Sequence, residues 1–168
     1  TVITHHELAM QIRNLGFHGS IIDIGAVTSS QMESLKRGFS VIGQVSSFFL
    51  TSCDAYGIFD HDHFQNVIQN QKPDAVIFTF SQSLTRSKLS GQHTHITSKV
   101  LDSDPGLAGF FWFSSSKDLE SLDRILVPGQ EEGSADHVLK FAVESGKKVL
   151  AYPLKHYIHL GTEAEFLE

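Results

Sequence analysis

The sequence predicts a three-layer α/β domain, Rossmann-like or flavodoxin-like, with a mostly parallel sheet of five or six strands. Short apolar runs alternate along the chain with segments whose apolar residues recur at helical spacing, a pattern typical of repeated strand–helix–strand units. The clearest unit lies within residues 122–153, where an apolar strand at 125–127 precedes a helix and a second buried strand at 148–152.

The helix of this unit has recognisable ends. Ser134 is a candidate N-cap with Asp136 in the first turn, and Gly146 followed by two lysines is a C-terminal stop. Because strand–helix–strand crossovers in one sheet are almost always parallel and right-handed, we expect the loop at 128–133 at the carboxyl edge of the sheet. Ligands of open α/β sheets bind at that edge.

The start of the chain also has the strand–helix–strand pattern. Apolar residues at helical spacing predict a helix over 5–15 that Gly16 ends, after a strand fragment at 1–4. The β-branched run at 20–27 predicts the next strand.

A serine-capped short helix is expected next. It covers 31–37, begins after Ser29 or Ser30 and is closed by Gly38. Residues 39–50 are apolar and rich in β-formers, so they are interpreted as extended with a bend at Gly43.

The middle of the chain holds the clearest strand. Residues 52–60 are predicted as a loop that ends at Asp60, the N-cap of a helix over 61–71. The nearly continuous hydrophobic run at 74–80 is the pattern of a central parallel strand covered on both faces. Two further elements are predicted, a helix over 93–101 and a buried strand over 107–113.

Length and charge limit the classes of function. With 168 residues, 40% of them hydrophobic, the chain suits one domain with a sizeable core. Its formal net charge of −6 and its scattered 13 Lys and Arg argue against nucleic-acid or anionic-membrane partners, which need a concentrated basic face. The chain opens on Thr1 and ends at Glu168, and we expect it to be one part of a larger protein.

A single cysteine, Cys53, excludes an intrachain disulfide and a cysteine-based metal cluster. This composition fits a reducing compartment. The sequence shows neither a signal peptide nor an apolar run of membrane-spanning length, so we expect a soluble, cytoplasmic protein without a membrane partner.

The first candidate site is the hydroxyl-rich segment 81–90, which follows the central strand at its carboxyl end. Arg86 suits a bidentate grip on phosphate or carboxylate, and Lys88 suits a point-charge contact. Ser81 and Ser83 add hydroxyl groups. The alternative interpretation is a solvated loop whose hydroxyls make local turns.

The second candidate site is the loop that enters the helix at Ser134. Gly129, Gly133 and Ser134 could offer backbone N–H groups to a phosphate at a helix N-terminus. Glu131 or Glu132 would orient a ribose or act as a general base. No complete dinucleotide or P-loop fingerprint is present, and an ordinary strand-to-helix connection with an acidic tip remains the alternative.

The chain contains 10 histidines, several of them in clusters. His61, Asp62 and His63 follow the cap residue Asp60, but the helical HxxxH spacing of a zinc site is absent, so no metal ligands are assigned. A capped, acid-rich helix start explains the same residues. A metal-dependent hydrolase that adds His93 or His95 to this cluster is a third hypothesis.

Two short stretches resemble known families. Residues 117–153 resemble the last strand–helix–strand unit of GT-B glycosyltransferases, where an acidic Gly-containing loop and a helix ending in Gly-Lys-Lys-Val hold the nucleotide sugar. The loop here lacks the acidic-Gly-aromatic-Gly run of that family. Residues 64–80 with 107–113 are similar to receiver-like domains, but Ser81 occupies the position of the phosphorylated aspartate, which implies a pseudo-receiver.

The leading hypothesis is a nucleotide or sugar-phosphate binding domain, part of a glycosyl- or ribosyl-transferring enzyme, whose ligand is a phosphate-bearing small molecule. The alternative is a non-catalytic sensory or protein-interaction domain of a multidomain regulatory protein, motivated by the incomplete catalytic motifs. That alternative expects a protein partner or a homo-oligomer. The sequence names no cofactor.

Overall fold

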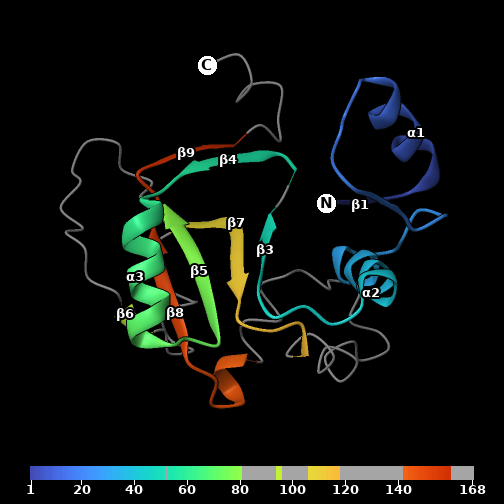
Figure 1. Ribbon diagram of the computed structural model, residues 1–168. Helices are drawn as coiled ribbons and strands as arrows, with labels where there is room; N and C mark the ends of the chain where they lie inside the picture. Colours follow the sequence, from blue (N-terminus) through green and yellow to red (C-terminus); the bar gives the residue numbers. More distant parts are fainter. Residues whose placement is uncertain (52, 81–93, 96–105, 118–141, 160–168) are drawn as a thin grey trace. The chain divides into compact units, whose positions relative to one another are not determined.

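The computed structural model describes residues 1–51, 53–80, 94–95, 106–117 and 142–159 (Figure 1). They fall into two compact units. The first contains Thr1–Ser46 and resumes at Ser116, and the second contains the other described residues. That the chain forms one domain stays a prediction. Among the described residues, no helix combines the length and apolar character needed to cross a membrane.

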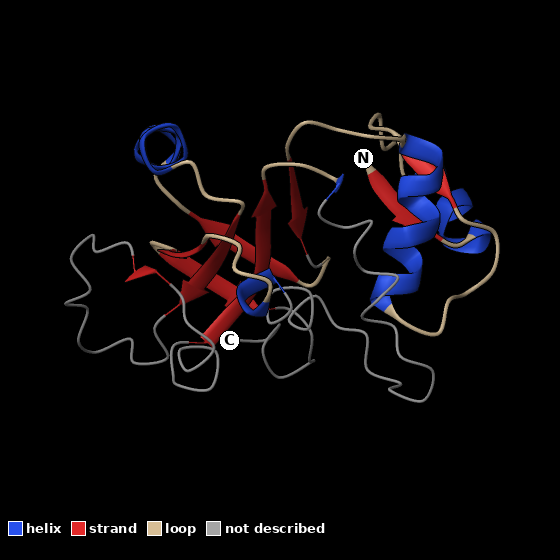
Figure 2. Cartoon of the chain, turned by 90° about the horizontal axis from the view of Figure 1, so that it is seen from below, coloured by secondary structure: helices blue, strands red, loops and turns tan. Residues whose placement is uncertain are grey.

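The described part of the first unit contains two parallel strands and two helices. Its elements in chain order are β1 (Val2–Thr4), α1 (His6–Asn14), β2 (Ile21–Asp23) and α2 (Gln31–Ile42). β1 pairs with β2 in parallel from Val2 opposite Ile21 to Thr4 opposite Asp23. α1 contacts β2, and α2 contacts both strands (Figure 2). The expected strand–helix–strand start is therefore confirmed, with a second strand shorter than the predicted 20–27.

The helix α2 continues through the glycine that was expected to end it. Gly38 is buried, and a β-carbon at this position would collide with the side chain of Ile3 in β1. The glycine therefore permits close helix–strand packing. The helix ends instead at Gly43, whose φ is +76°, a conformation that favours glycine. The prediction of extended structure at 39–50 is wrong over the helical residues up to Ile42.

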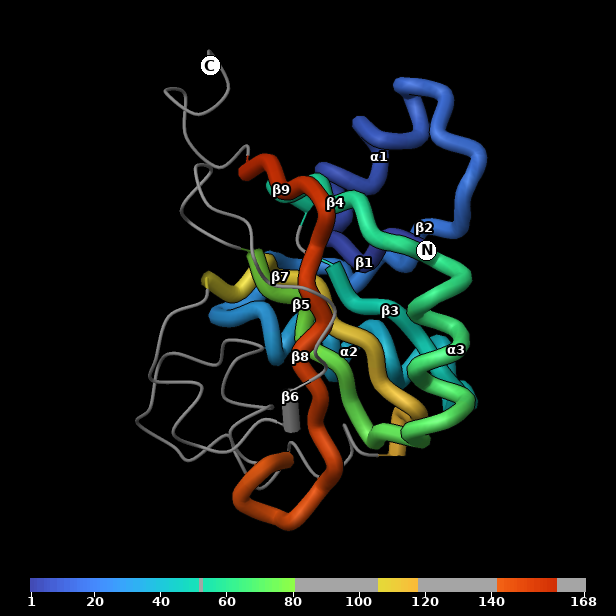
Figure 3. Tube along the Cα trace, turned by 90° about the vertical axis from the view of Figure 1, so that its left-hand side faces the viewer, coloured from blue at the N-terminus to red at the C-terminus, as the bar shows by residue number. Residues whose placement is uncertain are grey.

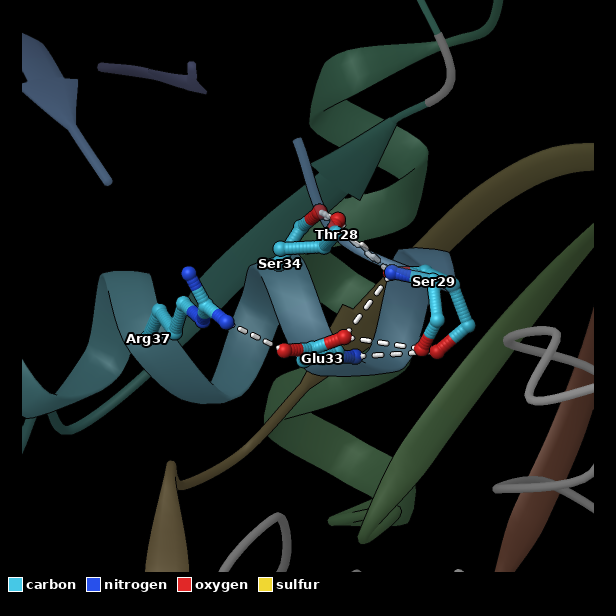
Figure 4. Close-up of polar contacts among 6 residues, drawn as sticks. Thr28, Ser29, Glu33, Ser34 and Arg37 are labelled. Atoms are coloured by element: carbon cyan, nitrogen blue, oxygen red, sulfur yellow. Dashed lines mark hydrogen bonds and ion pairs between the residues drawn. The ribbon is translucent and has the colours of Figure 1, made fainter. Parts of the chain in front are cut away.

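A polar network closes the N-terminus of α2 (Figure 4). The Ser30 hydroxyl accepts a hydrogen bond from the Glu33 backbone N–H at 3.2 Å. The Glu33 carboxylate accepts bonds from the Ser29 backbone N–H and hydroxyl, both at 2.8 Å, and from the Arg37 guanidinium at 2.5 Å. The Ser29 backbone and hydroxyl donors, followed by Arg37, lower the pKa of Glu33 from 4.5 to about 2.

The second unit contains a mixed five-stranded sheet with the strand order β3-β7-β5-β8-β6. The strands are β3 (Phe48–Thr51), β5 (Ala75–Phe80), β6 (Thr94–His95), β7 (Gly106–Phe113) and β8 (Val149–Pro153). Only β5 and β8 pair in parallel; β3–β7, β7–β5 and β8–β6 are antiparallel. A mostly parallel sheet is therefore not confirmed, because β7 runs against both of its neighbours.

Three strands nevertheless point the same way. β7 is antiparallel to both β3 and β5, so β3 and β5 share one direction, and β8 is parallel to β5. Figure 3 shows β5 and β8 side by side. The carboxyl ends at Thr51, Phe80 and Pro153 therefore lie at one edge of the sheet, called the carboxyl edge below, and the opposite edge is the amino edge.

One helix, α3 (His61–Gln71), packs on this sheet (Figure 1). Its fully buried Phe64 and its nearly buried Val67 join a core with Phe78, Trp112 and Leu150. Asp60 is the N-cap, as expected, and its side chain accepts a hydrogen bond from the His63 backbone N–H at 3.0 Å. The prediction for this helix is confirmed. The strand predicted at 74–80 is central and buried, as expected, but it is parallel only to β8 and antiparallel to β7.

A two-stranded antiparallel sheet lies beside the carboxyl edge. It pairs β4 (Ala55–Ile58) with β9 (His156–His159), from Ala55 opposite His159 to Ile58 opposite His156. The Leu154 N–H donates to the Thr79 carbonyl at 2.8 Å, and the Lys155 N–H donates to the Ile58 carbonyl at 2.7 Å. The predicted loop at 52–60 is wrong over β4, because the partner strand comes from the far end of the sequence.

Two remaining predictions are partly covered by the described residues. Thr94 and His95 form a strand with β8 where a helix over 93–101 was expected. Residues 142–144 are helical, and Gly146 has a φ of +75° and donates its N–H to the Val143 carbonyl at 3.0 Å, which confirms the predicted helix end. The predicted cap at Ser134 and strand at 125–127 lie outside the described residues.

We predict that Gly38→Ala destabilises the protein. The added methyl group must displace Ile3, and overpacking outweighs the gain in helix propensity, so the free energy of unfolding should fall by about 1 kcal/mol. Urea unfolding measures this change. Ser40→Ala, at an exposed position of the same helix, should have little effect. Ile3→Ala should partly rescue Gly38→Ala, and an unchanged stability of Gly38→Ala would contradict the packing role.

A second prediction concerns the pH dependence of stability. Because folding lowers the pKa of Glu33, its ionised form stabilises the folded state above about pH 4.5, and this contribution is lost as the pH falls toward 2. Thermal melts of wild type and Glu33→Gln should therefore differ most above pH 5 and converge near pH 2. A difference independent of pH would show that the carboxylate charge is not responsible.

Candidate functional site

The site residues predicted from the sequence lie outside the described residues. They are Ser81, Ser83, Arg86, Lys88, Gly129, Glu131, Glu132, Gly133 and Ser134. One constraint on them comes from the described part. Phe80 is the last residue of β5, so the segment that carries Arg86 and Lys88 leaves the sheet at its carboxyl edge.

Among the described residues at this edge are two pairs of side chains, each with one acidic and one basic member. The first pair is Asp54, in the turn between β3 and β4, with His159 at the end of β9. The second is Asp60, the N-cap of α3, with Lys155, which lies between β8 and β9. Elements far apart in the sequence thus bring acidic and basic groups to one edge.

The first pair is held by strand pairing. Ala55 lies opposite His159 in the β4–β9 sheet, so the adjacent Asp54 is brought to the histidine. The His159 Nε2 and Asp54 Oδ2 atoms are 3.7 Å apart, and the two side chains are 39% and 43% exposed. At this separation the imidazole nitrogen and the carboxylate oxygen lie beyond hydrogen-bonding distance, and both side chains remain accessible to solvent.

The second pair is held more tightly. The Lys155 ammonium donates a hydrogen bond to Asp60 Oδ2 at 3.0 Å, while Asp60 Oδ1 accepts from the His63 N–H. The His63 backbone N–H, followed by the Lys155 ammonium, lowers the pKa of Asp60 below its ordinary value. The carboxylate therefore stays ionised beside the lysine at neutral pH.

Tyr152 connects this pair to the core. Tyr152 is only 3% exposed, and its ring packs against Phe64 and Phe78, with ring centroids 5.2 and 5.6 Å away. Its hydroxyl donates to the Asp60 carbonyl at 3.1 Å and lies 2.9 Å from His63 Nδ1. Burial, followed by the nearby Asp60 charge, raises the pKa of Tyr152, so the hydroxyl keeps its proton.

The described histidines do not assemble a metal cluster. Within the ranges that the structure describes, no group of three or more His, Cys, Asp or Glu side chains could hold an ion. The Nδ1 atom of His61 lies 3.8 Å from Asp62 Oδ1, and the Nδ1 atom of His63 contacts the Tyr152 hydroxyl. Of the two further histidines considered from the sequence, His95 lies in β6 opposite Leu150 of β8, and His93 lies outside the described residues. The hydrolase hypothesis thus gains no support from His61, Asp62 and His63.

Sequence reasoning missed Asp54, Lys155 and His159 as site residues. A signal was present for Asp54, because it closely follows the apolar run of β3, where ligand-binding acids of α/β proteins often lie. It was passed over because residues 52–60 were interpreted as an ordinary loop. His159 was noted from the sequence only as one of the clustered histidines, and Lys155 carries no comparable local signal.

No family model matches the chain, and no curated protein matches it. Solved structures do match. A nucleoside-diphosphate-sugar pyrophosphorylase from Vibrio cholerae RC9 is similar with a TM-score of 0.65 and 17% identity, over 96% of this chain and 73% of that chain. The UTP-bound UGPase from Acinetobacter baumannii has a TM-score of 0.63 and 11% identity, over 98% and 68%.

An inositol-1-phosphate CTP transferase from T. maritima is also similar, with a TM-score of 0.56 and 14% identity, over 93% of this chain and 65% of that chain. At these identities the likeness shows the fold. The chain therefore has an α/β fold similar to nucleotidyltransferase and pyrophosphorylase domains.

We predict that Tyr152→Phe lowers the free energy of unfolding by about 1 kcal/mol, because the ring packing is kept while the hydroxyl bond to Asp60 is lost. Urea unfolding monitored by circular dichroism measures the change. Tyr56→Phe is the matched control, since Tyr56 is 55% exposed. Equal stabilities of the two variants would show that the Tyr152 hydroxyl contributes nothing to this edge.

Proposed function

We propose that this chain is the phosphate-handling α/β domain of a nucleotidyltransferase that joins a nucleotide to a sugar phosphate or a similar phosphate-bearing acceptor. The observation that carries the proposal is the carboxyl edge, where three strands of one direction end and Asp54, Asp60, Lys155 and His159 gather. The fold shared with the pyrophosphorylases supports it.

In this reaction an oxygen of the acceptor phosphate attacks the α-phosphorus of a nucleoside triphosphate. A new P–O bond forms, the bond to the β-phosphate oxygen breaks, and pyrophosphate leaves with the bonding electron pair. The protein positions the two anionic reactants and neutralises charge on the transferred and leaving groups. This reaction therefore requires cationic groups that contact the phosphates at the carboxyl edge of the sheet.

A divalent cation commonly supplies part of this neutralisation by bridging substrate phosphates. Asp54 fits such an ion in type, because magnesium is bound through one or two carboxylates together with substrate phosphates. The imidazole of His159, whose Nε2 lies 3.7 Å from Asp54 Oδ2, is not a ligand that this ion prefers. One or two protein ligands suffice when phosphates and water complete the shell. In this proposal Asp54 would be the protein's ligand to the ion.

The sequence-predicted residues complete the proposed site. Arg86 and Lys88 would hold phosphate oxygens, because the segment that carries them leaves from the same edge. Ser81 and Ser83 would add hydrogen bonds. The second loop would supply the backbone N–H groups of Gly129, Gly133 and Ser134, with Glu131 or Glu132 orienting a ribose.

The alternative of a non-catalytic sensory domain receives no support from the similar structures, which are named as nucleotide-transferring enzymes. We therefore retain one proposed function.

The test is release of pyrophosphate from a panel of nucleoside triphosphates and sugar phosphates, with magnesium or manganese present. Wild type should release pyrophosphate with at least one combination. Asp54→Asn and the double variant Arg86→Ala with Lys88→Ala should each lower the rate by about a hundredfold or more, because electrostatic contacts dominate this chemistry.

Glu144→Gln is the matched control for Asp54→Asn. Glu144 is an exposed carboxylate just before the amino end of β8, at the opposite edge of the sheet. Its substitution should leave the rate unchanged. A wild-type protein that neither binds any triphosphate nor releases pyrophosphate would overturn the proposed function, and a fully active Asp54→Asn would overturn the role of this carboxylate.

A further inference from the structure

Lys155 has an unusual position among the described lysines of the second unit. Lys72 is the C-cap residue of α3, before β5 begins, and Lys147 and Lys148 directly precede β8. These three lysines lie at the amino edge of the sheet. Lys155 follows β8 and is the lysine that the described residues place at the carboxyl edge.

The backbone at Lys155 is anchored on both sides. The Leu154 N–H donates to Thr79 of β5, and the Lys155 N–H donates to Ile58 of β4. Gly57 packs against Leu154 so closely that a β-carbon there would lie 2.9 Å from the leucine side chain. The base of the lysine side chain is therefore fixed where β4, β5 and β8 meet.

The tip of the side chain is fixed by Asp60. The ammonium lies 3.0 Å from Asp60 Oδ2, and Asp60 itself is held by the His63 N–H at its other oxygen and by the Tyr152 hydroxyl at its carbonyl. Lys155 remains 58% exposed. An ammonium has three N–H donors, so the bond to Asp60 leaves donors for an anion from solvent.

Stability does not account for this arrangement. Exposed ion pairs contribute little to folding because solvent screens their charges and both side chains lose conformational freedom. A lysine held in one place at a strand-end edge is instead preorganised to bind an anion, since its ordering cost is met before the ligand arrives.

Resting on the proposed function, we propose that Lys155 binds the diphosphate portion of the nucleotide, or the pyrophosphate product, and that Asp60 is the positioning residue that holds its ammonium in place. Asp60 carries a negative charge and touches no ligand in this scheme. It acts on the anion only through Lys155.

The direction in which Asp60→Asn changes anion affinity distinguishes a positioning role of Asp60 from a purely electrostatic one. If Asp60 acted only as a nearby negative charge, Asp60→Asn would strengthen anion binding by removing a repulsion. If Asp60 positions Lys155, the same substitution weakens binding because the ammonium is released. Asparagine is also a good N-cap, so Asp60→Asn preserves the start of α3.

The experiment is titration calorimetry of the full chain with inorganic pyrophosphate in the presence of magnesium. Lys155→Met keeps the length of the side chain and removes its charge, and it should weaken binding about tenfold or more, the effect of one charge-assisted hydrogen bond. Lys155→Arg should retain most of the affinity. Lys147→Met is the matched control, because Lys147 also faces a carboxylate, Asp74, at 3.8 Å but lies at the amino edge.

Asp60→Asn and Lys155→Met are then combined in one double variant. Asp60→Asn should weaken pyrophosphate binding in the wild-type background and have no weakening effect in the Lys155→Met background. Thermal melts establish that each variant is folded at the titration temperature. This pattern, with an unchanged Lys147→Met, supports the proposal.

Each other result has a distinct meaning. Tighter binding by Asp60→Asn overturns the positioning role. Lys155→Met that binds as wild type overturns the role of Lys155 and leaves the proposed function intact. A wild type that binds no pyrophosphate overturns the role of Lys155, and the pyrophosphate-release assay then decides whether the proposed function stands.

Discussion

The placement of β7 between β3 and β5 is the constraint on which the second unit depends. Phe113 of β7 lies opposite both Phe48 of β3 and Ala75 of β5, so one antiparallel strand brings two parallel ones into register. With β8 parallel to β5, three carboxyl ends reach the same edge. Although the sheet is mixed, it keeps the feature at which parallel sheets bind ligands, an edge where the carboxyl ends of several strands lie together.

The β4–β9 sheet builds on that edge. β4 follows β3 after a short connection, and β9 is the last described strand of the chain. The pairing of β4 with β9 places Asp54 beside His159. The connection from β8 to β9 is held by backbone bonds to Thr79 and Ile58, which also brings Lys155 to Asp60. Regular hydrogen bonding between backbones, which side chains only modulate, therefore determines where the charged groups lie.

Aromatic packing makes this arrangement rigid. Phe64, Phe78 and Tyr152 have mutual ring-centroid distances between 5.2 and 5.6 Å, in tilted and edge-to-face geometries that aromatic pairs favour. Tyr152 adds a hydroxyl at the border of this cluster, and that hydroxyl satisfies the Asp60 carbonyl. The hydrophobic core and the polar edge are thus joined through one side chain, which fits a site whose groups must stay in place.

The sequence by itself determined the local features: a serine cap at position 29 or 30, the cap Asp60, the helix stop at Gly146 and the buried run of β5. These depend on contacts within a few residues, which a linear pattern records. The tertiary structure alone decided the direction of β7, the role of Gly38, the strand β4 and the charged pairs. Asp60 and Lys155 are 95 positions apart, and only strand pairing and packing, which no local pattern encodes, bring them together.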